Sequence, residues 1–259
     1  MSVPLNRKKL VSSSLVTPED FFAYKQNCSQ LEAAPDLHEA KSALLYFSGK
    51  LETHIKYNLP VTPVKNLSSS LLYHGQGNPV VLQRSGIGAP SAVTLVEELI
   101  HLGIKRIVSI GTAGCLCSDL APGQIVVCTG AYRDEGTSWH YMAGKKRILA
   151  NDNLTAKLAS ALHGQDLEFR QGISWTTDAP YRETKADYTF YKHRKVVTVE
   201  MEASALMAVS KVRGIDFASV FVVSDHLTPA GWHPNFNDWR VSSSLIYKLL
   251  PVAISVLEA

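Results

Sequence analysis

Two carboxylates flank a thioether in the run Glu200-Met201-Glu202, which follows the apolar segment 196–199 and begins a helical pattern. One carboxylate at such a place can accept hydrogen bonds from two vicinal sugar hydroxyls, while the methionine packs on the apolar face of the sugar. A simpler interpretation is helix-start bias, because the helix macrodipole favours acids in the first turn. The run is therefore a candidate sugar-binding site.

A lone acid follows a second apolar run. Residues 218–223 are mostly apolar, and Ser224, Asp225 and His226 come directly after them. A carboxyl group at the mouth of a buried strand can hold a proton and hand it to a leaving group. The alternative is an aspartate that caps the next turn. We take Asp225 as the candidate general acid.

Two turns of small residues can hold an anion. Residues 85–88 (Ser-Gly-Ile-Gly) end one predicted strand, and residues 111–114 (Gly-Thr-Ala-Gly) end the next. Glycines let the backbone approach a ligand, free N–H groups at a helix start favour anions, and the Thr112 hydroxyl can donate to a phosphate or sugar oxygen. Glycine also marks plain tight turns. Neither turn has the G-x-G-x-x-G pattern of dinucleotide sites, and no G-x-x-x-x-G-K-[ST] phosphate loop is present.

Alternating strands and helices must position these residues. Such alternation predicts a single α/β domain over 1–259, in which helices flank a central mixed, largely parallel sheet in three layers. Before the Pro-rich passage 59–70, helix-like apolar spacing predicts a helical amino-terminal segment, 1–58, that packs on this domain. Strands are expected at 79–85, 106–111, 124–132, 167–177, 196–201 and 218–225, and helices near 90–102, 151–163, 202–213 and 238–257.

Composition excludes several classes of protein. Lys+Arg number 26 against 23 Asp+Glu, a net charge of +3, and 46% of the 259 residues are hydrophobic. A globular chain is expected, and the small excess charge argues against a nucleic-acid partner. The opening residues lack the apolar core of a secretory signal, and no stretch approaches the length of a membrane span, so we expect a cytoplasmic protein with no membrane partner.

The four cysteines predict neither a disulfide framework nor a metal site. Cys28, Cys115, Cys117 and Cys128 are too few and too unevenly spaced for a chain of this length. The pair Cys115-Leu-Cys117 could ligate a metal, but no second Cys/His pair lies at a suitable spacing. We therefore expect free thiols and no metal.

Residues 79–230 resemble the nucleoside phosphorylase and nucleosidase superfamily, which contains uridine phosphorylase and the hexameric purine nucleoside phosphorylases. The resemblance rests on an ordered set of motifs. They are SGIGAPSAVTLVEEL, IGTAG, LAPGQIVVCTGAYRDEGTSWHY, VEMEASAL and VVSDHL.

This resemblance implies attack at C1′ of a nucleoside by phosphate or water, with departure of the base. It implies a small-molecule nucleoside substrate, phosphate as co-substrate, no other cofactor, and a homodimer or a hexamer built as a trimer of dimers. It implies that Glu202 is catalytic and binds ribose with Met201 and Glu200, and that Asp225 contacts the base. Phosphate would lie near Gly86, Ser109, Gly111 and Thr112, and the base near Trp175, Thr176, Thr177 and Tyr181.

The chain departs from the family pattern at the nucleophile. The phosphorylases usually have an arginine two residues before the Gly-Thr turn, where this chain has Ser109, and the early G-D-P segment with its arginine is not recognisable. Either Arg84, Arg133, Arg182 or an arginine of a neighbouring subunit supplies the charge, or water attacks. Uridine phosphorylases bind the edge of uracil with a Gln and an Arg. These would align near Thr184 and Ala186, so uracil recognition by that route is absent here.

Three hypotheses follow: a phosphorylase for purine or uridine-type nucleosides, a nucleosidase on the same fold, and a non-catalytic nucleoside-binding protein. All three would bind similar ligands at the same site, so the sequence does not decide between these hypotheses. His140 can reach the nucleoside or shape a subunit contact, and Arg182-Glu183 can form a surface ion pair or gate the pocket.

Overall fold

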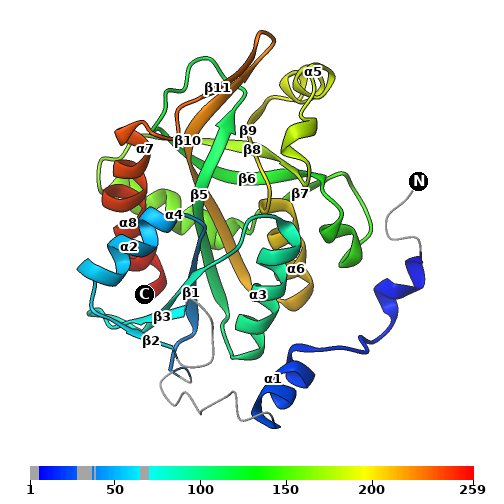
Figure 1. Cartoon of the computed structure of the whole chain (residues 1–259), viewed down its shortest axis with the longest axis vertical. Coiled ribbons are helices and arrows are strands. Elements are labelled where there is room, and N and C mark those ends of the chain that lie inside the picture. Colours follow the sequence, from blue (N-terminus) through cyan, green and yellow to red (C-terminus); the bar gives the residue numbers. More distant parts are fainter. Residues whose placement is uncertain (1–5, 28–36, 38, 65–69) are drawn as a thin grey trace.

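The structure, a computed structural model, describes residues 6–27, 37, 39–64 and 70–259 (Figure 1). The strands are β1 (Ser42–Tyr46), β2 (Val61–Pro63), β3 (Ser70–Tyr73), β4 (Val80–Arg84), β5 (Arg106–Cys115), β6 (Ile125–Asp134), β7 (Arg147–Leu149), β8 (Phe169–Thr177), β9 (Val196–Glu200), β10 (Asp216–Thr228) and β11 (Gly231–Pro234). The helices are α1 (Pro18–Asn27), α2 (Gly49–Asn58), α3 (Ala89–His101), α4 (Asp152–Gly164), α5 (Lys185–His193), α6 (Ala203–Arg213), α7 (Trp239–Ser243) and α8 (Leu250–Glu258). Short 3-10 helices occur at Arg7–Val11, Thr137–His140 and Pro180–Arg182, and a π-helical turn at Ser244–Leu249 joins α7 to α8.

The strands form one mixed sheet in the order β11-β10-β6-β8-β9-β5-β1-β4-β3-β2, with β7 paired to β6. At its centre β4, β1, β5 and β10 run parallel to one another. Because β10 pairs with both β5 and β6, the strands β5, β10, β6, β8 and β9 close into a ring. The ring places Val199 of β9 and Asp225 of β10 opposite the same residue of β5, Gly114.

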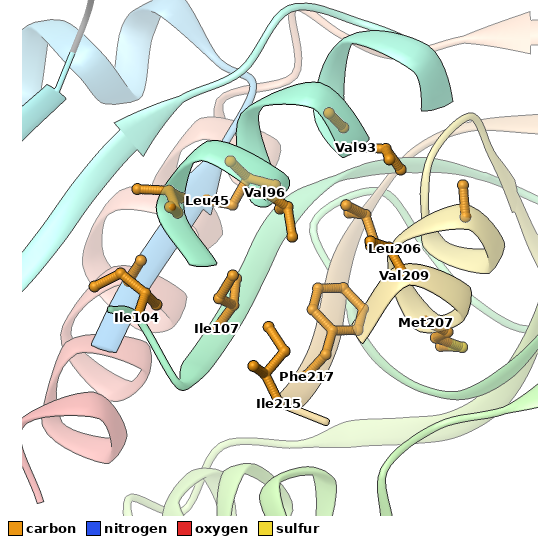
Figure 2. Packing of buried hydrophobic residues seen from close by; sticks show 14 of the residues in the cluster. Leu45, Val93, Val96, Ile104, Ile107, Leu206, Met207, Val209, Ile215 and Phe217 are labelled. Carbon is orange, nitrogen blue, oxygen red and sulfur yellow. The ribbon is translucent and has the colours of Figure 1, made fainter. Parts of the chain in front are cut away.

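Helices cover both faces of the sheet, so the predicted three-layer α/β architecture is confirmed (Figure 1). On one face, α3 and α6 pack on β1, β5 and β10, and Figure 2 shows their interlocking side chains. On the other face, α2, α4 and α8 bury a second apolar cluster. The labelled residues of Figure 2 are Leu45, Val93, Val96, Ile104, Ile107, Leu206, Met207, Val209, Ile215 and Phe217.

The prediction that segment 1–58 is helical is wrong over 42–46. The run Ser-Ala-Leu-Leu-Tyr forms β1, every residue of which is buried, and β1 lies between β4 and β5 in the middle of the sheet. A short apolar run that is buried on both faces has no period of its own, so its leucines can be counted equally well as a helical stripe. The amino-terminal segment is thus part of the sheet that carries the site.

The chain ends in an apolar helical run, Trp239–Glu258, of 20 residues with a mean hydropathy of 1.4. By length and composition it could span a membrane, but 56% of it is buried inside the protein. Its apolar side chains pack in the same cluster as Leu44 and Val108 of the sheet. Burial against the sheet therefore accounts for its composition.

Candidate active site

Glu200 is the last residue of β9, and the hydrogen-bond donors to its carboxylate come from the protein itself. Its Oε1 accepts hydrogen bonds from the hydroxyls of Ser174 (3.1 Å) and Thr176 (2.6 Å), and its Oε2 accepts from the backbone N–H groups of Glu202 and Ala203, both at 2.7 Å. Burial raises its pKa, and these four donors oppose that rise. Four donors occupy the carboxylate, so Glu200 orients the start of α6.

Glu202 is differently placed. Its Oε1 accepts a hydrogen bond from the backbone N–H of Gly88 at 2.6 Å, which links the end of β9 to the turn after β4. The backbone N–H of Met201 also acts on this carboxyl group, and no side chain of the described residues donates to it. Burial, and then the charge of Glu200, raise the pKa of Glu202 to about 8. Glu202 is therefore a carboxyl group that backbone N–H groups orient.

Gly86 lies in the turn after β4, but Gly111 lies within β5, which continues to Cys115, so the predicted turn at 111–114 is wrong. A Cβ atom on Gly86 would lie 2.6 Å from the Ser91 hydroxyl oxygen, and one on Gly111 would lie 3.2 Å from the Phe47 ring. At both positions a side chain would force a neighbouring atom to move. Thr112, one residue after Gly111, is partly buried, and within the described part of the chain its hydroxyl makes no hydrogen bond. Thr112 can therefore donate to a ligand oxygen.

Ser109 does not reach this edge. It lies in the middle of β5, 2% exposed, opposite Ser219 of β10, and its hydroxyl donates to the Ser219 hydroxyl at 2.7 Å. The expectation that Ser109 helps to bind the nucleophile is thus not supported by its position. The Ser109 hydroxyl instead makes a hydrogen bond with Ser219 inside the sheet.

Asp225 lies in β10 and does not cap a turn. Its Oδ1 accepts from the Ser224 hydroxyl at 2.7 Å, and its Oδ2 accepts from the indole N–H of Trp232 at 2.8 Å. A Cβ atom on Gly114 would lie 2.8 Å from Oδ2, so Asp225 packs directly on β5. Trp232 belongs to β11, which folds back on β10 as a hairpin. The carboxyl group is buried but lies under a partly exposed indole.

Sequence analysis overlooked Glu183 as a site residue. Burial raises its pKa to about 7, and the carboxylates of Asp225 and Asp187 raise it as well. Glu183 is partly buried, whereas the adjacent Arg182 is exposed, and the structure records no ion pair between them. Glu183 and Asp225 thus lie close enough for their charges to interact.

The predicted base-binding stretch divides into buried and exposed residues. Trp175 is 1% exposed, stacks on Tyr191 with ring centroids 4.4 Å apart, and donates its indole N–H to Asp134 at 2.9 Å. Both ring and N–H are occupied, so Trp175 is a core residue and not an open stacking surface. Thr176 holds Glu200, and Thr177 accepts a hydrogen bond from the backbone of residue 179 at 3.3 Å. Tyr181 is fully exposed.

Of the proposed cations, Arg84 lies nearest to this edge. It ends β4, and its guanidinium donates to Glu52 of α2 at 2.7 Å. Arg133 is buried, donates to the Ser138 hydroxyl and to the carbonyl oxygens of residues 142 and 145, and covers the ring of Trp139, so its role is structural. His140 is exposed and 2.9 Å from the amine of Lys9.

The contacts join these residues into one region. Gly88 donates to Glu202, and Thr176 donates to Glu200, so these contacts join the ends of β4, β8 and β9. Gly114 of β5 packs against Asp225 of β10 and against Val199 of β9, which brings Asp225 next to the same strands. A hollow of about 680 Å³ lies elsewhere, lined by residues such as Asp119, His163 and Arg170. No cluster of three or more potential metal ligands occurs among the described residues.

Comparison with known proteins places this arrangement in a family. The model described as Phosphorylase superfamily matches residues 44–243. A guanosine phosphorylase from Halorubrum lacusprofundi is 30% identical over 151 residues, covering 58% of this chain and 63% of the relative. A uridine phosphorylase from Treponema pallidum is 31% identical over 161 residues, covering 58% and 62%.

The matched part spans about three fifths of the length of these two relatives. A purine nucleoside phosphorylase from Toxoplasma gondii, solved in complex with immucillin-H, shares the fold with a TM-score of 0.77 and 18% identity, covering 88% of this chain and 96% of that one. Because the family model matches well over half of the sequence, the chain belongs to the phosphorylase superfamily.

Proposed function

We propose that the protein is a nucleoside phosphorylase, which transfers the pentose of a purine or uridine-type nucleoside to phosphate. The observation that carries the proposal is the Gly88–Glu202 contact, which holds an oriented carboxyl group against the turn after β4. Guanosine and uridine phosphorylases among the relatives support the same reaction.

In the proposed reaction a phosphate oxygen bonds to C1′ while the bond from C1′ to the base nitrogen breaks and its electron pair leaves with the base. Thr112 and the turn at Gly86 bind the phosphate, and Glu202 accepts hydrogen bonds from the vicinal sugar hydroxyls. Asp225 faces the base, which takes up a proton as it leaves. Catalysis rests on alignment of the two reactants and on stabilisation of the departing base.

Hydrolysis is the second candidate, and one observation favours it. Ser109 carries no charge, and Arg84 is already paired at 2.7 Å with Glu52, which also pairs with Lys56. Water needs no such cation. A nucleosidase would release the free pentose at the same rate with and without phosphate.

The test is product analysis with guanosine, inosine, adenosine and uridine, in phosphate buffer and in phosphate-free buffer. A phosphorylase yields base and pentose 1-phosphate only when phosphate is present. At pH 9, above the pKa of about 8 at which this carboxyl group ionises, Glu202→Gln should lower kcat/KM by about 10–100-fold, since charge-assisted hydrogen bonds to the sugar are lost. Glu168→Gln, on the exposed surface, is the matched control. Binding without turnover of any nucleoside would indicate a non-catalytic protein and would refute the proposal.

We further propose a cytoplasmic homodimer, or a hexamer of three dimers. Exposed aromatic side chains near the site, Tyr181, Trp232 and Phe236, support a subunit contact there. The free thiols Cys115, Cys117 and Cys128 suit a reducing compartment. Sedimentation equilibrium measures the assembly directly, and a monomer at micromolar concentration would refute it.

A further inference from the structure

Two cysteines lie at the end of β5, one and three residues beyond Gly114, which packs against Asp225. Cys115, the last residue of the strand, is fully buried, and Cys117 is partly exposed. The backbone N–H of Cys117 donates to the sulfur of Cys115 at 3.2 Å, and the Cys115 thiol lies 3.3 Å from the carbonyl oxygen of Cys117. The chain therefore turns at Leu116 so that the backbone of Cys117 contacts the buried sulfur of Cys115, while Cys117 itself is partly exposed.

Cations surround the accessible thiol. Lys192 of α5 donates to the carbonyl oxygen of Leu116 at 2.7 Å, which fixes its amine over the turn. Arg170 of β8 reaches Cys117 while it pairs with Asp119 at 2.6 Å. The hydrogen bond from Cys115, followed by the charges of Lys192 and Arg170, lowers the pKa of Cys117 to about 6, whereas Asp119 and burial act in the opposite direction.

The thiol of Cys115 behaves in the opposite way. Its hydrogen bond to Cys117 and its burial raise its pKa, so it remains protonated when Cys117 is a thiolate. A thiolate is the nucleophile in thiol–disulfide exchange, and a neighbouring thiol can resolve the mixed disulfide that forms. An accessible acidic thiol backed by a second thiol has the parts that such an exchange requires.

We propose that Cys117 and Cys115 form a redox-active dithiol, in which Cys117 reacts with small-molecule disulfides such as oxidised glutathione and Cys115 then closes an intramolecular disulfide. This site does not depend on the proposed nucleoside chemistry. Lys192 and Arg170 are its positioning residues.

The small disulfide is the oxidant that accepts the two electrons lost by the dithiol. The Cys117 thiolate attacks one sulfur of oxidised glutathione, the sulfur–sulfur bond breaks, and one glutathione leaves as a thiolate that takes up a proton from water. The Cys115 sulfur then loses its proton, attacks the sulfur of Cys117 and releases the second glutathione. The protein loses two electrons and two protons, and one glutathione disulfide becomes two thiols.

The first experiment measures alkylation of the folded wild-type protein by iodoacetamide from pH 5 to pH 9, with each cysteine followed separately by peptide mass spectrometry. Cys117 should react first, and its rate should rise with a midpoint near pH 6. Cys115 and Cys128, which are buried, should react only after unfolding. A Cys117 rate no higher than that of free cysteine at pH 7, or a midpoint near the ordinary thiol value, would overturn the proposal.

The second experiment incubates the protein with oxidised glutathione and determines the mass of the product. Wild type should lose two hydrogens, Cys115→Ser should retain one glutathionyl group on Cys117, and Cys117→Ser should do neither. A glutathionyl group that persists on wild-type Cys117, or oxidation of Cys117→Ser like that of wild type, would refute the role of the pair. Lys192→Gln should raise the alkylation midpoint and Lys192→Arg should restore it, whereas a purely structural lysine would leave it unchanged. Circular dichroism checks that each variant is folded.

Discussion

The indole N–H of Trp232 donates a hydrogen bond to Oδ2 of Asp225 at 2.8 Å. The donor comes from β11 and the acceptor from β10, so the hairpin itself covers the candidate acid. Trp232 is nevertheless 58% exposed, which leaves its ring free to move. A base that takes the same lone pair of Oδ2 displaces this N–H.

Replacing Trp232 by Phe should therefore have opposite effects on the free and the liganded protein. Without nucleoside, Oδ2 loses its donor, and the free energy of unfolding should fall by about 1–3 kcal/mol. With a saturating nucleoside the loss should disappear, and the Kd of the nucleoside should fall by about tenfold because nothing has to be displaced. Chemical denaturation and calorimetric titration measure both quantities.

Trp239→Phe is the matched control, since Trp239 is 74% exposed and its indole makes no hydrogen bond within the described chain. It should change neither quantity. If Trp232→Phe weakens nucleoside binding, the indole must stay bound to Asp225 in the complex, and the displacement model is wrong.

The pKa of Glu202 predicts how stability depends on pH. Burial and Glu200 raise this pKa from 4.5 to about 8, and that of Glu200 is raised too, so between these limits the folded state binds more protons than the unfolded state. The free energy of unfolding should then fall as pH rises from about 5 to 8. Glu202→Gln should flatten this slope, by an amount on the order of a few kcal/mol at pH 8.5. Urea denaturation across the range tests it, and an unchanged slope would contradict the shift.

Gly114 makes room for Asp225. A Cβ atom there would lie 2.8 Å from Oδ2 of Asp225 and 3.0 Å from a methyl group of Val199, and both neighbours are held in strands. Gly114→Ala should lower the free energy of unfolding by about 1–3 kcal/mol and reduce kcat/KM, because the acid must shift. Gly164→Ala, where a Cβ atom meets nothing within 4 Å, should be neutral or stabilising. Equal behaviour of the two variants would show that Gly114 does not position the acid.

The sequence predicted the site-bearing strands because their pattern is local. Apolar runs ended by Gly, Glu or Asp identified β4, β5, β9 and β10, and the structure confirms each of them. It failed for β1, whose position between β4 and β5 depends on contacts distant in sequence. It also missed α5, although Thr184 and Asp187 form a capping box at its start.

Side-chain direction and tertiary partners were not readable from the sequence. Trp175 and Thr176 are adjacent in β8, but alternation places the first in an apolar cluster and the second on Glu200. The sequence left open whether Arg182-Glu183 forms a surface ion pair or gates the pocket, and it did not indicate that Trp232 and Glu183 lie near Asp225. Their proximity to Asp225 depends on the hairpin and on the turn before α5.

Ser109 allows a direct test of its structural role. Ser109→Ala removes the hydrogen bond to Ser219 and should lower the free energy of unfolding by about 1 kcal/mol. The KM for phosphate should stay within about twofold of wild type, since the side chain lies inside the sheet. Steady-state kinetics with varied phosphate give that constant, and a KM raised tenfold would return Ser109 to the phosphate site. Ser219→Ala, on the other side of the same bond, should behave identically.

Arg84 and Glu52 together decide whether phosphate can be the nucleophile. The guanidinium lies at the end of β4, immediately before Ser85 and Gly86, and pairs at 2.7 Å with Glu52, which Lys56 also contacts at 2.7 Å. If Arg84 binds phosphate, Arg84→Met should raise the KM for phosphate by about 10–100-fold, the equivalent of one hydrogen bond between charged groups. Glu52→Gln should lower the same KM, because the arginine no longer has a competing carboxylate. Arg170→Met, which removes an equally paired arginine at another edge of the sheet, should leave it unchanged. A rate that neither phosphate nor either variant alters would mean that water attacks C1′.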